Sequence, residues 1–153
     1  MKKRNIILIG MPGAGKSSVG VILAKALGYE FIDTDLVIQH REKRLLREII
    51  ADEGNEGFLA IENEVNATLE ADESVIAPGG SAIYGKEAME HFKEIGTIVY
   101  LKLSYEDLAK RLGNLKGRGV VLKEGQTLKD LYDERSKLYE QYACLLYTSD
   151  AAD

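Results

Sequence analysis

The stretch that decides the fold is NIILIGMPGAGKS, residues 5–17. Residues 5–9 are almost entirely apolar, which is typical of a strand buried on both faces of a sheet. Residues 10–17 then satisfy every fixed position of the pattern G-x-x-x-x-G-K-[ST]. Apolar residues recur at helical spacing from 16 to 27, and Gly28 is a natural stop. A strand, a glycine-rich loop and a helix in this order predict a phosphate-binding loop.

Each part of the loop suits phosphate chemistry. Its glycines let consecutive backbone N–H groups point toward one phosphate, and the N-terminus of the following helix adds its positive dipole end. Lys16 is placed to reach the outer phosphates, and the Ser17 hydroxyl is placed to bind Mg²⁺. The sequence therefore predicts a site for a nucleoside triphosphate.

The rest of the chain alternates between short apolar runs and helical patterns. This alternation predicts one α/β domain, in which helices cover both faces of a parallel sheet. A glycine-rich, basic stretch at 113–126 is expected to be a mobile loop that meets an anion. Strands are expected at 5–9, 29–33, 74–77 and 97–103, and helices at 16–27, within 35–69, and at 85–95, 104–112 and 127–142.

Composition narrows the class of protein. The 153 residues carry 20 Lys and Arg against 25 Asp and Glu, a net charge of −5, which argues against binding to nucleic acid. No apolar run is long enough to cross a membrane, and no signal peptide is expected. Cys144 is the single cysteine, so an intrachain disulfide is excluded. We expect a soluble, cytoplasmic protein.

Two carboxylates follow the second expected strand, in the stretch FIDTD at 31–35. In open parallel sheets, ligands bind at the edge where the strands end. One carboxylate of the pair is suited to hold the Mg²⁺ shell, and the other to orient or deprotonate an attacking hydroxyl. The alternative is that Asp33 or Asp35 only caps the next helix.

At this point the chain resembles the shikimate kinase family. The resemblance spans about residues 5–143. It rests on GMPGAGKSSVG at 10–20, FIDTD at 31–35, Gly79-Gly80 after a buried strand, the basic loop, and an arginine and a tyrosine near the end, Arg135 and Tyr139.

The resemblance implies a P-loop fold with three α/β/α layers and the strand order 2-3-1-4. It also implies a likeness in activity: ATP-dependent phosphorylation of the shikimate 3-hydroxyl in aromatic amino acid biosynthesis, with Mg²⁺, by a monomer. We expect a substrate-binding segment at about 35–70 that moves, and a lid at 113–126.

The family's site residues fall on matching positions of this chain. Asp35, Lys16 and Arg118 are then catalytic, with Asp35 as the base, and Ser17 and Asp33 hold the metal. Acceptor-binding residues are Asp35, Gly79, Gly80, Ser81 and Arg135. ATP-binding residues are Gly13, Ala14, Gly15, Lys16, Ser17, Ser18, Arg111, which stacks on adenine, and Arg118, which closes over the phosphates.

One departure concerns the acceptor. The family has an arginine for the shikimate carboxylate in F-R-x-x-E, but the matching stretch, 58–62, reads FLAIE, with Leu59 at that position. Losing one guanidinium partner is expected to cost about 1.5–3 kcal/mol of binding. A kinase for another hydroxylated acid or polyol, or a nucleotide-binding fragment without turnover, therefore stays open. A GTPase switch is disfavoured because N-K-x-D is absent.

A second departure concerns the end of the chain. The family pattern continues to a further strand and a closing helix, whereas residues 144–153 (CLLYTSDAAD) show no helix or strand period after Tyr147. We expect a domain at 1–143, a non-native tail at 144–153, and a sheet of about four strands that lacks the family's last one.

Overall fold

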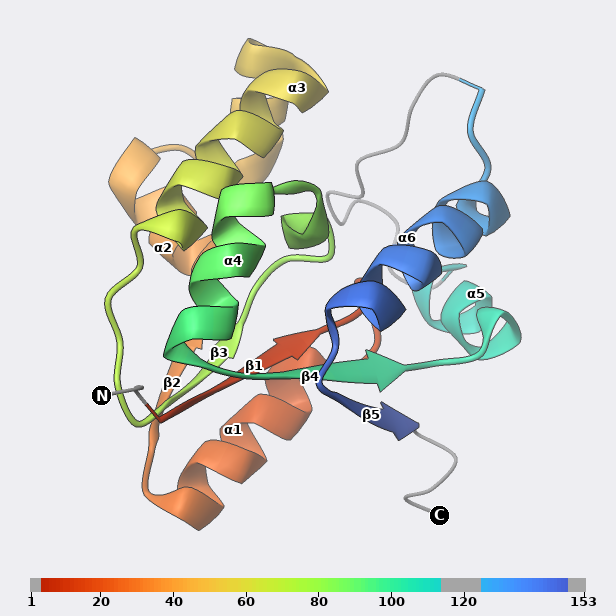
Figure 1. Cartoon of the computed structure of the whole chain (residues 1–153). Coiled ribbons are helices and arrows are strands. Elements are labelled where there is room, and N and C mark those ends of the chain that lie inside the picture. Colours follow the sequence, from red (N-terminus) through yellow and green to blue (C-terminus); the bar gives the residue numbers. More distant parts are fainter. Residues whose placement is uncertain (1–3, 114–124, 149–153) are drawn as a thin grey trace.

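The structure, a computed structural model, describes residues 4–113 and 125–148. It contains one sheet of parallel strands in the order β2-β3-β1-β4-β5 (Figure 1). The α/β class, the parallel sheet and the order of the first four strands are confirmed. The strands are β1 (Asn5–Ile9), β2 (Glu30–Asp33), β3 (Ser74–Ala77), β4 (Gly96–Lys102) and β5 (Leu145–Thr148).

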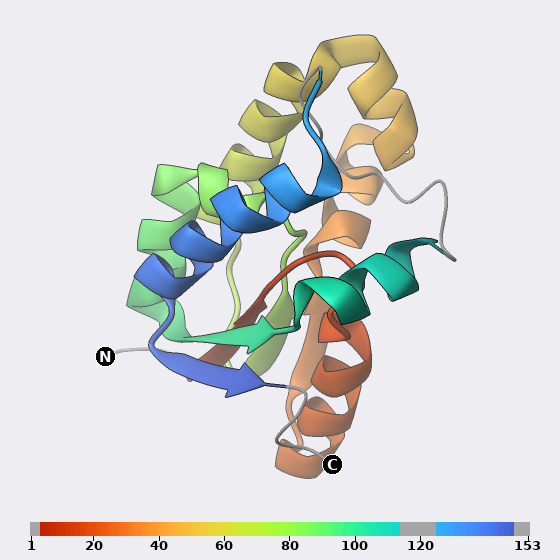
Figure 2. The same cartoon turned by 90° about the vertical axis from the view of Figure 1, so that its right-hand side faces the viewer.

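Helices cover both faces of the sheet. On one face α1 packs against β1 and its neighbours, and on the other lie α4 and α6 (Figures 1 and 2). Side chains of β1 alternate accordingly: Leu8 faces α1, whereas Ile7 and Ile9 face the opposite core. The helices are α1 (Lys16–Leu27), α2 (Thr34–Glu42), α3 (Leu46–Ala67), α4 (Lys86–Ile95), α5 (Tyr105–Gly113) and α6 (Leu128–Tyr142), with a short 3₁₀ helix η1 (Ala82–Tyr84).

The helices α2 and α3 form a separate layer beside α4. They share an apolar cluster, the α2–α3 cluster, made of Ile38, Ile49, Phe58 and Val65. Gly54, with φ of 75° and ψ of 175°, interrupts α3 with a kink. Only glycine adopts such angles readily, so the kink depends on this residue.

The start of α6 also follows the sequence prediction. The Thr127 side chain accepts a hydrogen bond from the Asp130 N–H, and the Asp130 carboxylate accepts one from the Thr127 N–H. This reciprocal pair fixes the first turn of the helix that carries Arg135.

The fifth strand differs from the expected four-stranded sheet. β5 pairs with β4 from Val99↔Leu145 to Lys102↔Thr148, and the Cys144 N–H donates to the Ile98 carbonyl at 2.8 Å. Its side chains stay outside the core, with Leu145 60% and Leu146 57% exposed. Backbone pairing with β4 therefore defines this strand, while its apolar residues Leu145, Leu146 and Tyr147 stay largely exposed.

No helix in the described ranges, 4–113 and 125–148, is long and apolar enough to cross a membrane.

Candidate active site

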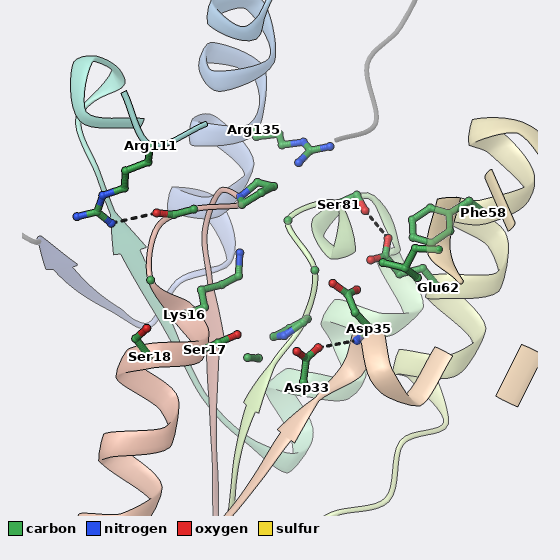
Figure 3. Close-up of a pocket in the computed structure, with 18 residues that line it drawn as sticks. Lys16, Ser17, Ser18, Asp33, Asp35, Phe58, Glu62, Ser81, Arg111 and Arg135 are labelled. Carbon is green, nitrogen blue, oxygen red and sulfur yellow. Dashed lines mark hydrogen bonds between the residues drawn. The ribbon is translucent and has the colours of Figure 1, made fainter. Parts of the chain in front are cut away.

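A cleft of about 690 Å³ opens where β1, β2 and β3 end, which is the ligand-binding edge of a parallel sheet. Figure 3 shows the side chains that surround it. They come from the phosphate loop, the first turns of α1 and α2, the ends of β2 and β3, α3, the turn after β3, and from α5 and α6. The lining residues are Pro12, Gly13, Gly15, Lys16, Ser17, Ser18, Asp33, Asp35, Leu46, Phe58, Glu62, Ala77, Pro78, Gly79, Gly80, Ser81, Arg111 and Arg135.

The predicted phosphate loop curls around the Lys16 ammonium. Gly13 and Gly15 have φ values of 87° and 92°, which residues other than glycine rarely adopt. The Lys16 ammonium donates to the carbonyls of Gly10 at 2.5 Å and Met11 at 3.1 Å. Burial lowers its pKa to about 8, against the opposing charge of Asp35. A phosphate entering the loop therefore meets a preformed cation at the start of α1.

The other predicted ATP-binding residues occupy different places around the loop. Ser17 and Ser18, in the first turn of α1, line the cleft. Ala14 is not among the lining residues, and its N–H donates to the Met11 carbonyl at 3.1 Å within the loop. Arg111 reaches over from α5 and donates to the Gly13 carbonyl at 3.0 Å. Arg118 lies outside the described residues.

The acidic pair combines both of the roles weighed from the sequence. Asp33 is the N-cap of α2, and its Oδ1 accepts the Asp35 N–H at 2.9 Å. Both residues nevertheless line the cleft opposite Lys16 (Figure 3). Burial, with the neighbouring Asp33 charge, raises the pKa of Asp35 to about 6, while Lys16 opposes the shift. Asp35 is thus a carboxylate whose basicity suits proton abstraction near neutral pH.

The turn after β3 requires two glycines because side chains crowd it. A Cβ on Gly79 would lie 2.8 Å from Asp35 Oδ1 and 3.0 Å from Glu62 Oε2. A Cβ on Gly80 would lie 2.6 Å from Pro12 Cδ and 2.9 Å from Arg135 Nη1. Because Gly79 and Gly80 have no side chains, a ligand can approach the backbone of this turn closely. The turn therefore forms the floor of the cleft.

Arg135 is a buried cation on this floor. It is 1% exposed, and its guanidinium lies 5.5 Å from the centre of the Tyr84 ring. The side chain is therefore not on the solvent-exposed face of α6. A guanidinium held between an aromatic ring and the diglycine turn can bind an anionic group of a ligand.

Sequence reasoning did not assign Glu62, Phe58, Leu46 or Tyr139 to the site. Glu62 and Phe58 reach it because the part of α3 after the Gly54 kink runs past the cleft. The Tyr139 hydroxyl donates to the Gly80 carbonyl at 2.6 Å from one turn beyond Arg135. The spacing of Arg135 and Tyr139 at i and i+4 was a signal for this pair. Leu59 does not line the cleft; it packs against the α2–α3 cluster.

A parallel sheet with a phosphate loop after β1 and paired carboxylates after β2 defines a phosphotransferase of the P-loop class. A family model described as shikimate kinase matches residues 12–153. The chain belongs to the shikimate kinase family.

Individual relatives agree with this assignment. The chain is 36% identical to the shikimate kinase of Chlorobium phaeovibrioides over 154 residues, covering 94% of this chain and 78% of the relative. It is 34% identical to shikimate kinase 2 of Yersinia enterocolitica, covering 92% and 83%. Among solved structures, shikimate kinase from Acinetobacter baumannii in complex with shikimate matches with a TM-score of 0.86 and 35% identity. That match covers 95% of this chain and 83% of the other.

Proposed function

We propose that this protein transfers the γ-phosphoryl group of ATP to the 3-hydroxyl of shikimate, giving shikimate 3-phosphate and ADP. The observation that carries the proposal is that one cleft holds a phosphate loop on one wall and a carboxylate with a buried guanidinium on the other. Membership of the shikimate kinase family supports it, as does the match to a relative solved with shikimate.

The reaction assigns a task to each wall. Asp35 takes the proton of the acceptor hydroxyl as its oxygen forms a bond to the γ-phosphorus. The bond from that phosphorus to the β,γ-bridging oxygen breaks, and ADP leaves. Lys16 stabilises the charge on the transferred group, and the loop N–H groups hold the phosphates. Arg135 binds the acceptor carboxylate above Gly79 and Gly80.

The residues of the cleft fit Mg²⁺. Ser17 offers a hydroxyl oxygen and Asp33 a carboxylate, both lining the cleft beside the phosphate loop. The hydrogen bond from Asp35 engages only Oδ1 of Asp33, which leaves Oδ2 to face a hydrated ion. Magnesium prefers oxygen ligands and retains several waters, so two protein oxygens with substrate phosphates suffice. Bound there, Mg²⁺ would neutralise charge on the phosphates.

Several finer parts of the proposal rest on the family resemblance. Arg111 stacks on adenine after leaving the Gly13 carbonyl, and Arg118 in the lid at 113–126 closes over the phosphates. Residues 35–70 move as the acceptor binds. The protein acts as a monomer in the cytoplasm, in aromatic amino acid biosynthesis.

Leu59 supports a second candidate acceptor. Among the described residues that line the cleft, the cations are Lys16, Arg111 and Arg135. Of these three, only Arg135 lies beside the diglycine turn, Gly79-Gly80, which forms the acceptor end of the cleft. A single guanidinium binds a carboxylate with lower affinity than two guanidinium groups do. Another small hydroxylated acid or a polyol is therefore the alternative substrate, and nucleotide binding without turnover is the non-enzymatic alternative.

The deciding experiment measures ADP release from MgATP by the folded protein, with shikimate and without it. We expect release that depends on shikimate and is lost in Lys16→Ala. Release equal to the buffer blank, from protein shown to be folded, would reject shikimate as the acceptor. The same assay with other hydroxylated acids and polyols then separates a different kinase from a protein without turnover.

A further inference from the structure

Glu62 is a buried acid at the acceptor end of the cleft whose task the reaction above leaves open. It projects from α3 and is 1% exposed. Its Oε1 accepts a hydrogen bond from the Ser81 hydroxyl at 2.6 Å, across the turn that follows β3 (Figure 3). Its carboxyl group therefore lies on the same floor as Asp35 and Arg135.

The shortage of hydrogen-bond donors around Glu62 favours its neutral form. An ionised carboxylate has about four acceptor positions and is costly to bury unless donors fill them. Glu62 receives one donor, Ser81, and its Oε2 is buried with no hydrogen-bond partner in the described parts of the chain. A proton on Oε2 removes the charge and keeps the Ser81 bond, because Oε1 still accepts.

The charges facing Glu62 come from three other elements. Asp35 on α2 raises its pKa, whereas Arg135 on α6 and Lys16 on α1 lower it, as does the Ser81 hydrogen bond. Burial is the largest influence, and the net result is a pKa of about 7. The residue one turn before Glu62 on α3 is Leu59, which packs against the α2–α3 cluster. No cation at that position of α3 therefore stabilises the ionised form of Glu62.

We propose that Glu62, held by Ser81, takes up a proton when the acceptor binds and thereby sets the affinity of the cleft for an acceptor that carries a carboxylate. The inference rests on the proposed function for the identity of that acceptor. When Glu62 is neutral, one negative charge fewer lies near Arg135 and Lys16. The electrostatic potential in this part of the cleft is then more positive, and it attracts the carboxylate of the acceptor more strongly. Glu62 acts through the charge of the cleft and is a specificity-determining residue.

The test is calorimetric binding of shikimate at pH 6, 7 and 8, without nucleotide. We expect affinity to fall about tenfold from pH 6 to pH 8, as one group with a pKa near 7 loses its proton. The uncharged methyl ester of shikimate should bind with little dependence on pH. In Glu62→Gln, which is neutral and keeps an oxygen for Ser81, affinity at pH 8 should approach that of the wild type at pH 6.

Two further variants separate charge from structure. Ser81→Ala removes a hydrogen bond that lowers the pKa of Glu62, so the midpoint of the affinity profile should move to higher pH. A purely structural role for Ser81 would weaken binding and leave the midpoint in place. Glu64→Gln, which neutralises an exposed carboxylate on α3, should keep the wild-type profile.

The outcomes distinguish this inference from the proposed function. If Glu62→Gln keeps the full pH dependence, or affinity rises with pH, the inference is wrong while shikimate-dependent ADP release still supports the function. If the affinity of the wild type depends on pH, and Glu62→Gln removes this dependence, but no ADP is released, the proposed function is wrong and the inference stands. If the wild type binds shikimate at no pH, both are wrong.

Discussion

Asp35 is half-buried, which favours its neutral form, whereas the proton-accepting role proposed for it requires the ionised form. We expect Asp35→Asn to lower kcat by roughly 10²–10⁴-fold, because the amide cannot take the hydroxyl proton. In the wild type, kcat should fall as pH drops through about 6, where Asp35 becomes protonated. Steady-state kinetics from pH 5 to pH 8 check both statements; an Asp35→Asn enzyme with wild-type kcat would contradict the assignment.

The stability of the same variant provides a control against misfolding. The pKa of Asp35 is raised in the folded state from 3.8 to about 6, so the folded state binds this proton more tightly than the unfolded chain does. Ionisation of Asp35 at pH 8 therefore destabilises the fold. Asp35→Asn should melt at a temperature equal to or above that of the wild type at pH 8, as measured by circular dichroism.

Among single residues, those in short continuous sequence motifs were predicted best. Lys16, Asp33 and Asp35 lie in short motifs next to strands, and the structure brings them to one cleft; their roles stay predictions. Arg135 and Glu62 lie in helices far along the chain. Their burial depends on how α3 and α6 pack, which no local pattern encodes.

The kink in α3 carries a prediction at the scale of the element. Gly54 has φ 75° and ψ 175°, so Gly54→Ala should lower the free energy of unfolding by about 1–3 kcal/mol. It should also raise the KM for the acceptor, because α3 beyond the kink places Glu62 and Phe58 in the cleft. Urea unfolding and kinetics measure the two effects. Glu56→Ala, at an exposed site on the same helix, is the control and should change stability by less than about 0.5 kcal/mol.

Most helices and strands were predictable from hydrophobic periods in the sequence, and β5 is the exception. The start of α1 followed from the glycine-rich loop, and the helix expected at 127–142 is α6, Leu128–Tyr142. β5 was not expected, because residues 144–153 were interpreted as a tail outside the domain; its backbone nevertheless pairs with β4, and Leu145, Leu146 and Tyr147 stay largely exposed. The order of the strands came from the family resemblance, since periodicity alone does not fix which strands are neighbours.

For the whole molecule, the nucleotide site links function to stability. MgATP binds only the folded loop, so it should raise the melting temperature, with a gain of about 2.7 kcal/mol at a hundredfold excess over Kd. Lys16→Ala should lose most of this gain, while Lys25→Ala, at an exposed position in the last turn of α1, should keep it. Thermal melts with and without MgATP provide the measurement. An equal gain in wild type and Lys16→Ala would place the nucleotide elsewhere.

β5 has a consequence for how the chain can change over generations. Its backbone alone joins it to the sheet, and Leu145, Leu146 and Tyr147 are 60%, 57% and 40% exposed. Substitutions at these three positions that preserve an extended backbone remove little packing, so selection for the fold constrains their identity weakly. Lineages of this protein should therefore drift faster here than in the buried β1, and a library randomised at these positions should retain folded members at high frequency.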